Sequence, residues 1–192
     1  MPTIFFQIWG GGFYLLNKIF FSRAERCTGD KQKAWKANAW FVYLLGLPAI
    51  LVLFYLKRNW IGFAIEGGSA ASMVLGLVIA KRGIENAPKW LDYIALCCVI
   101  IGIGFSLYDF GGITTLNQVL ELGMSVGFLL GVYLLAKENP NGYLWFMLMN
   151  VSTFFLMYIQ DYYIMTVQQA ISLGFVVDAY RTQLIRKRNS TA

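Results

Sequence analysis

The chain has no histidine and few cysteines, and these scarcities limit the chemistry that it can perform. Because none of the 192 residues is histidine, histidine-ligated haem, histidine-based zinc sites and histidine proton relays are excluded. The three cysteines show no metal-binding spacing, and we expect the adjacent pair Cys97-Cys98 to pack as small apolar side chains inside a helix. We therefore expect no metal and no cofactor.

Charged residues are also scarce, at 14 % of the chain, whereas apolar residues make up 58 %. A soluble domain usually carries about 25 % charged residues. Seven apolar stretches account for the difference, each close to the roughly 20 residues that a helix needs to cross a bilayer. They do not alternate as the roughly ten-residue strands of a membrane barrel do. We predict an all-α, polytopic membrane protein with seven transmembrane helices, near 3–21, 37–56, 59–80, 91–109, 115–136, 143–159 and 162–180.

The first apolar stretch could instead be a cleaved signal peptide. No basic region precedes it, and Lys18 lies inside it. The sequence that follows, from Ser22 to Arg26, is not a small-residue cleavage site. We expect this stretch to remain as a membrane helix.

The basic residues indicate the orientation. If the N-terminus faces outward, the outer loops contain only Lys57 and Arg58. Basic residues concentrate on the cytoplasmic side, so the N-out, C-in orientation is favoured. The same bias explains the net charge of +6, and with no separate soluble domain we expect no nucleic-acid binding. The inner loops and tail would contain thirteen basic residues: Arg23, Arg26, Lys31, Lys33, Lys36, Lys81, Arg82, Lys89, Lys137, Arg181, Arg186, Lys187 and Arg188.

Two parts of the chain resemble each other. In the first, Trp40-Phe41 opens an apolar run, a polar break follows, and the next helix contains Glu66. In the second, Trp145-Phe146 opens such a run and the helix after the break contains Gln169. The distance from tryptophan to polar residue is 26 positions in one copy and 24 in the other, and 12–16 similarly matches 127–130. A duplicated three-helix unit is typical of a transporter with its site between the halves. A chance match in a Leu-, Phe- and Gly-rich chain is the alternative.

Duplication of three helices requires an additional helix if both copies are to have the same orientation. The fourth segment fits this role, because its polar residues Asp92 and Asp109 lie at its ends. We predict one membrane domain, 1–192, with a first three-helix bundle at 1–87, a linker helix at 88–110 packed on the outside, and a second bundle at 111–188. This is a 3+1+3 parallel duplication.

Polar residues inside membrane helices are candidates for function, because burying them is costly. Glu66 lies in a helix rich in glycine, serine and alanine. Gln169 lies at the matching place in the second copy, and we expect it, rather than the adjacent Gln168, to point inward. Asn150 lies in the middle of the sixth segment. For each of these residues, a hydrogen bond that only holds two helices together is the alternative.

Aromatic residues form the second group of candidates. Trp40 and Trp145 could stack on a flat ligand, or anchor helix ends at the membrane surface. Tyr158 clusters with Tyr162 and Tyr163 at a helix junction. Near the inner surface, we expect Asp178 to pair with Arg181. No catalytic set or phosphate-binding loop is apparent, so we do not expect an enzyme.

The stretch 134–145, which ends at Trp145, and Asn150-Val151-Ser152 after it resemble the PnuC-type vitamin transporters. The resemblance is good over about 110–188, moderate over 88–110 and weak over 1–87. It implies a SWEET-like 3+1+3 carrier of nicotinamide riboside in the bacterial inner (cytoplasmic) membrane, whose relatives carry thiamine or riboflavin. Such carriers work by facilitated diffusion and alternating access, and a cytoplasmic kinase traps the product.

The resemblance also implies site residues. Trp145 and Asn150 would be ligand contacts, and so would Gln169. Trp40 and Glu66 follow through the duplication. Where the family has an in-membrane glutamine in its first copy, this chain has Glu66, and an acid there would suit a cationic or strongly donating ligand.

The partners that we expect are a small vitamin, membrane lipid and, functionally, a cytoplasmic kinase; a homo-oligomer is one option for the assembly. A non-transporting membrane interaction or assembly subunit is the alternative function. Uniport is favoured because the chain has no histidine relay, but Glu66 and Glu121 keep proton coupling open.

Overall fold

A computed structural model describes residues 2–56, 58, 60–109, 115–159, 161 and 163–191, and over these residues the protein is all-α. The all-α prediction is confirmed, and each of the seven predicted segments corresponds to one helix. Lys57, Asn59, Gln160, Tyr162 and the stretch 110–114 lie outside the described residues. The helices are α1 (Pro2–Glu25), α2 (Gly29–Leu56), α3 (Trp60–Arg82), the short 3-10 helix η1 (Ile84–Asn86), α4 (Lys89–Asp109), α5 (Leu116–Ala136), α6 (Asn141–Ile159) and α7 (Tyr163–Thr191).

Four of the described helices are long and apolar enough to cross a membrane. They are α2, α3 from Gly62 to Arg82, α5 and α6. Length and composition alone identify these four, since a crossing helix needs about 20 mostly apolar residues.

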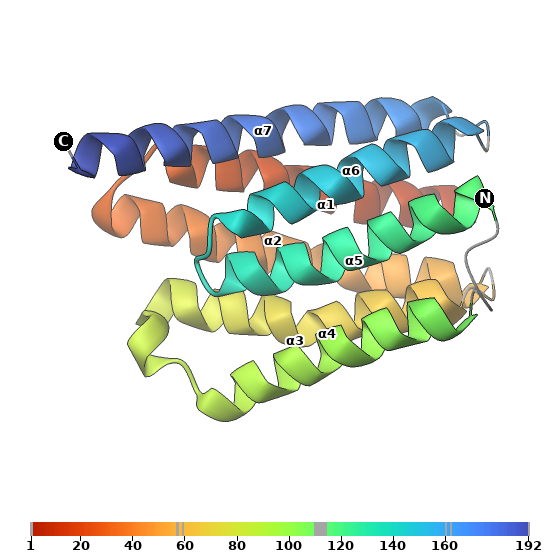
Figure 1. Cartoon of the computed structure of the whole chain (residues 1–192), viewed down its shortest axis with the longest axis horizontal. Coiled ribbons are helices and arrows are strands. Elements are labelled where there is room, and N and C mark those ends of the chain that lie inside the picture. Colours follow the sequence, from red (N-terminus) through yellow and green to blue (C-terminus); the bar gives the residue numbers. More distant parts are fainter. Residues whose placement is uncertain are drawn as a thin grey trace.

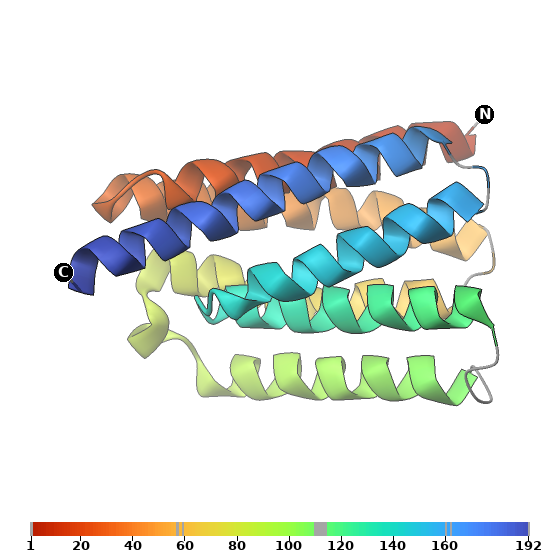
Figure 2. The ribbon, with the colours of Figure 1, turned by 45° about the horizontal axis from the view of Figure 1, so that its top comes forward.

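Six helices form a closed ring. Each packs on the next in the order α1, α2, α3, α5, α6, α7, and α7 packs back on α1. Among the described residues, α4 packs only on α3 and α5 and lies outside the ring, at one edge of the bundle in Figure 2. The two ends of the chain lie at opposite ends of the bundle (Figure 1). That α4 is a linker helix between two bundles stays a prediction.

Polar contacts join α4 to the end of α5. Asp92 on α4 accepts hydrogen bonds from the Tyr133 hydroxyl at 3.0 Å and from the Lys137 Nζ at 2.5 Å, at the end of α5. Because both donors belong to one neighbouring helix end, they set the position of α4 along α5.

Local sequence explains where α5 begins and ends. Thr115 and Gln118 form a reciprocal capping box at the start of α5, which satisfies two backbone N–H groups. At the other end, the Asn139 N–H bonds to the Leu134 carbonyl at 2.9 Å, with Glu138 in the left-handed region at φ 57°. This Schellman-type end, followed by Pro140, stops α5 and turns the chain into α6.

A glycine allows α5 and α6 to approach each other closely. A Cβ atom at Gly127 would lie 2.7 Å from the Trp145 carbonyl oxygen and 2.7 Å from the Met149 nitrogen, both backbone atoms. Small residues at helix interfaces permit this close contact. The spacing of the two helices therefore depends on the absence of a side chain at this position.

Candidate functional site

The ring of six helices encloses a cavity of about 210 Å³. All six helices contribute to its lining, and among the described residues α4 contributes none. The cavity lies nearer the end of the bundle where α1 begins. Its lining consists of Gln7, Gly11, Tyr14, Leu15, Lys18, Tyr43, Ile50, Leu53, Phe54, Gly62, Ile65, Glu66, Met124, Ser125, Phe128, Met149, Thr153, Met157, Met165, Gln168, Gln169 and Ser172.

Glu66 brings a carboxylate to the cavity from α3. The Tyr14 hydroxyl on α1 donates a hydrogen bond of 2.6 Å to the Glu66 Oε2, and Ser69 donates one of 2.6 Å to the Glu66 carbonyl oxygen. A hydrogen bond to a charged group is shorter and stronger than a neutral one. The carboxylate is thus held in place by a neighbouring helix while it faces the cavity.

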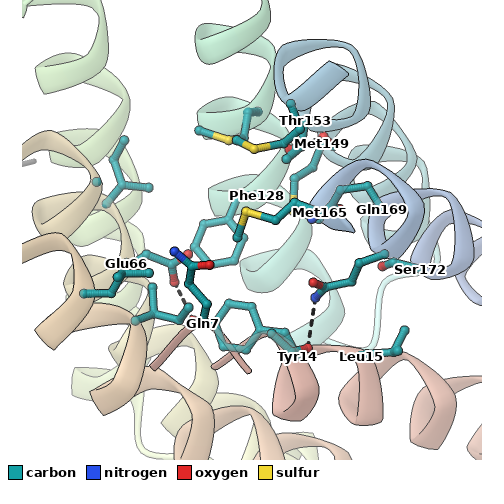
Figure 3. A pocket seen from close by; sticks show the side chains of 18 of the residues that line it. Gln7, Tyr14, Leu15, Glu66, Phe128, Met149, Thr153, Met165, Gln169 and Ser172 are labelled. Atoms are coloured by element: carbon teal, nitrogen blue, oxygen red, sulfur yellow. Dashed lines mark hydrogen bonds between the residues drawn. The ribbon is translucent and has the colours of Figure 1, made fainter. Parts of the chain in front are cut away.

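Gln169 lies on the opposite side of the cavity from Glu66, as Figure 3 shows. We predicted that only Gln169 of this pair points inward, and this was wrong, because Gln168 also lines the cavity. The Gln168 Nε2 donates to the Gly11 carbonyl oxygen at 3.0 Å and so links α7 to α1. Successive residues on a helix point about 100° apart, and a cavity that extends from α1 to α6 receives both.

Lys18 is one of the polar lining residues that were not among the candidates from the sequence. Its side chain lines the cavity and is only 4 % exposed. The Nζ atom lies 3.3 Å from the centre of the Phe146 ring and 5.0 Å from that of Tyr43, and it has no hydrogen-bond partner among the described residues. The signal was present, because a lysine inside an apolar run is expensive unless it is used.

Packed aromatic rings close the cavity toward the other end of the bundle, where the α1–α2 and α5–α6 turns lie. Trp40 stacks on Tyr43 with ring centres 6.3 Å apart, and Phe21 meets Trp40 edge-on at 5.1 Å. Trp40 is 2 % exposed and packs against Gly76. It belongs to this aromatic layer and is not among the lining residues of the cavity.

The remaining candidates from the sequence also lie outside the cavity lining. Asn150 is fully buried, and its Nδ2 donates to the Phe146 carbonyl oxygen one turn earlier in α6 at 2.6 Å. Trp145 is half-buried, and Tyr158 is 58 % exposed and packs edge-on against Tyr163. Of the six residues predicted to bind substrate, the structure brings only Glu66 and Gln169 together at the cavity. Binding by any of the six stays a prediction.

A set of polar contacts joins α1 and α2 to α6, α7 and the α5–α6 turn, at the end of the bundle that the aromatic layer closes. Asp178 on α7 accepts from Ser22 at 2.5 Å and from Arg26 at 2.8 Å, both on or next to α1. We predicted an ion pair with Arg181, but the salt bridge of Asp178 is with Arg26, and Arg181 acts on the carboxylate as a nearby positive charge. The hydrogen-bond partners of Asp178 lie on or next to α1, which packs beside α7. Because these residues are more than 150 positions away in the sequence, the sequence alone does not indicate that they meet.

Two further contacts lie in the same region. Glu25 is 2 % exposed and accepts a hydrogen bond of 3.0 Å from the Tyr143 hydroxyl, while Lys36 pairs with Glu138 at 3.1 Å. Each of these contacts connects the first three helices with the last three. We call these contacts the polar clasp: Ser22 and Arg26 with Asp178, Glu25 with Tyr143, and Lys36 with Glu138.

Comparison of the chain with protein-family models, curated proteins and solved structures gave no match.

Proposed function

We propose that this chain is a membrane transporter that carries a small B-type vitamin or nucleoside-like molecule, with nicotinamide riboside as the leading candidate. The observation that carries the proposal is the cavity itself. It lies between two groups of three helices and contains carboxylate, amide, hydroxyl and amine side chains inside an otherwise apolar bundle. In membrane helices such polar groups mark substrate pathways.

The pattern of contacts between the helices supports the 3+1+3 arrangement that we propose for the seven helices. If α1, α2 and α3 are exchanged with α5, α6 and α7, every neighbour relation in the ring is preserved, including α1 with α7 and α3 with α5. Glu66 and Gln169, which the internal repeat aligns, face each other across the cavity (Figure 3). Parallel repeats with a site at their interface are a known transporter design.

The lining suits a small flat ligand that forms hydrogen bonds. Tyr14, Tyr43 and Phe128 supply aromatic surface, and the amides of Gln168 and Gln169 can both donate and accept. Four methionines, Met124, Met149, Met157 and Met165, add an adaptable apolar surface. Facilitated transport needs binding that is specific but readily reversed, and such a lining provides both.

Alternating access explains why the cavity lies off-centre. In the observed arrangement, the aromatic layer and the polar clasp close one end of the bundle. In the N-out orientation favoured by the basic residues, this is the cytoplasmic end. Release of the ligand would require α1–α3 and α5–α7 to separate at this end. The membrane would be the bacterial inner membrane, and a kinase in the cytoplasm would trap the released product.

The test is the thermal stability of the purified protein with nicotinamide riboside, thiamine or riboflavin. A ligand at 100 times its Kd stabilises the folded state by about 2.7 kcal/mol, which corresponds to several degrees for a chain of this size. Uptake of the stabilising ligand into proteoliposomes then distinguishes a carrier from a binding subunit. If none of the three ligands shifts the unfolding temperature of a well-folded sample, these vitamins are not the substrates. A non-transporting interaction subunit then becomes the better explanation.

A further inference from the structure

Among the described residues that line the cavity, the Lys18 Nζ is the one fully buried side-chain nitrogen or oxygen atom without a hydrogen-bond partner. It is buried, and the ring faces of Phe146 and Tyr43 lie near it. Aromatic faces attract a cation, but they are weaker acceptors for its N–H groups than a carbonyl or carboxylate oxygen. An ammonium group has three donors, and leaving them unmet in an apolar bundle costs free energy. Among the described residues no oxygen accepts a hydrogen bond from Lys18, so an oxygen acceptor on a bound molecule would complete its environment.

The position of Lys18 on α1 defines where this acceptor would lie. Lys18 follows Tyr14 by four residues, so both side chains lie on the same face of α1, about 6 Å apart along its axis. Tyr14 holds the Glu66 carboxylate at 2.6 Å. The cavity thus has an acid at one level and a basic group about one helical turn deeper, next to the aromatic layer.

We propose that Lys18 binds a carboxylate or carboxamide oxygen of the transported molecule, while Glu66 receives its cationic or donating part. The ligand is then a heteroaromatic molecule with both characters, entering with its oxygen acceptor first. This inference rests on the proposed function, because it assigns the ligand chemistry of the same cavity. The inference adds that the ligand must have an oxygen acceptor in order to be recognised, and that Lys18 is the residue that donates a hydrogen bond to this acceptor.

The experiment compares wild-type protein with Lys18→Met. Methionine keeps a long side chain that can pack on the Phe146 ring but has no donor. Three probes share one ring and sugar: nicotinamide riboside, nicotinic acid riboside, and the pyridine riboside that lacks the acceptor. Affinities are measured by thermal-shift titration. Lys89→Met, at an exposed position at the start of α4, serves as the control variant.

Wild type and Lys89→Met should bind the two acceptor-bearing ribosides about tenfold or more tightly than the pyridine riboside, as expected for a hydrogen bond to a charged group. In Lys18→Met this preference should disappear, while affinity for the pyridine riboside is retained. Retained binding of that probe also shows that the variant is folded. If Lys18→Met still binds the acceptor-bearing ribosides more tightly than the pyridine riboside, as the wild type does, Lys18 does not bind the acceptor and the inference is overturned.

A second pair of probes separates this inference from the choice of substrate. If no riboside binds wild-type protein, the proposed vitamin is wrong, and nicotinate and nicotinamide are tested against pyridine as simple acceptor-bearing rings. Binding of either that is lost in Lys18→Met supports the role of Lys18 for a different ligand of this class. If no acceptor-bearing probe binds in preference to pyridine, the role of Lys18 is refuted.

Discussion

Gly127→Ala tests the packing that shapes the cavity. The added Cβ atom would lie 2.7 Å from the Trp145 carbonyl oxygen and from the Met149 nitrogen. These are backbone atoms of a continuous helix, so α5 and α6 have to separate. Overpacking of this kind typically costs about 1–3 kcal/mol. For a chain of 150–250 residues, each kcal/mol corresponds to roughly 2–4 °C in unfolding temperature, so we expect a loss of several degrees.

Gly12→Ala is the matched control, because the internal repeat aligns Gly12 with Gly127. A Cβ atom at Gly12 meets nothing within 4 Å. Alanine is also preferred over glycine within a helix by about 0.5–1 kcal/mol, so its unfolding temperature should stay level or rise. The assay is thermal unfolding of both variants in the same detergent. Ligand affinity should fall only in Gly127→Ala, since α5 and α6 contribute Phe128 and Thr153 to the cavity.

An equal change in both variants would contradict the close approach of α5 and α6 at Gly127. A loss of stability without a loss of affinity would show that the spacing of these helices does not control the cavity.

The other predictions concern individual polar groups. Glu66→Gln removes the carboxylate charge but keeps an acceptor for Tyr14, so titrations should show cationic ligands weakened about tenfold and neutral ligands much less. Gln169→Ala should weaken ligand binding several-fold, at about 0.5–1.5 kcal/mol for one hydrogen bond, whereas Val167→Ala on the exposed face of α7 should not; equal effects would remove Gln169 from the site. Tyr143→Phe takes a donor from the buried Glu25 and should lower stability by about 1–3 kcal/mol in thermal unfolding. Asp178→Asn breaks an exposed ion pair and should cost less than about 1 kcal/mol, and a larger loss than in Tyr143→Phe would reverse our ranking of the clasp contacts.

The number and positions of the helices were predictable because they depend on local properties. Apolar runs of about 20 residues separated by polar breaks specify helices wherever they occur. The breaks at Gly29 and Gly83, which have φ 60° and 84°, are also local signals. The sequence alone likewise identified Glu66 and Gln169 as unusual, since a polar side chain in an apolar run is visible without any structure.

The composition of the site was not predictable in the same way. Where the helices line the cavity, their other faces are also largely apolar, so no polar stripe indicates which face turns toward the cavity. Trp40 and Asn150 were selected by type and spacing, yet one lies in the aromatic layer and the other bonds within its own helix. Tyr14 and Gln7 were passed over because isolated polar residues on α1 do not reveal which helix they face.

The sequence by itself determined an all-α chain of seven helices with two polar residues at matching places in an internal repeat. Only the tertiary structure decided that α7 packs on α1, that Tyr14 holds Glu66, and that Lys18 reaches the same cavity. The physical reason is the range of the interactions. Helix formation depends on neighbours within a few residues, whereas a cavity is the space left when helices distant in sequence pack around each other.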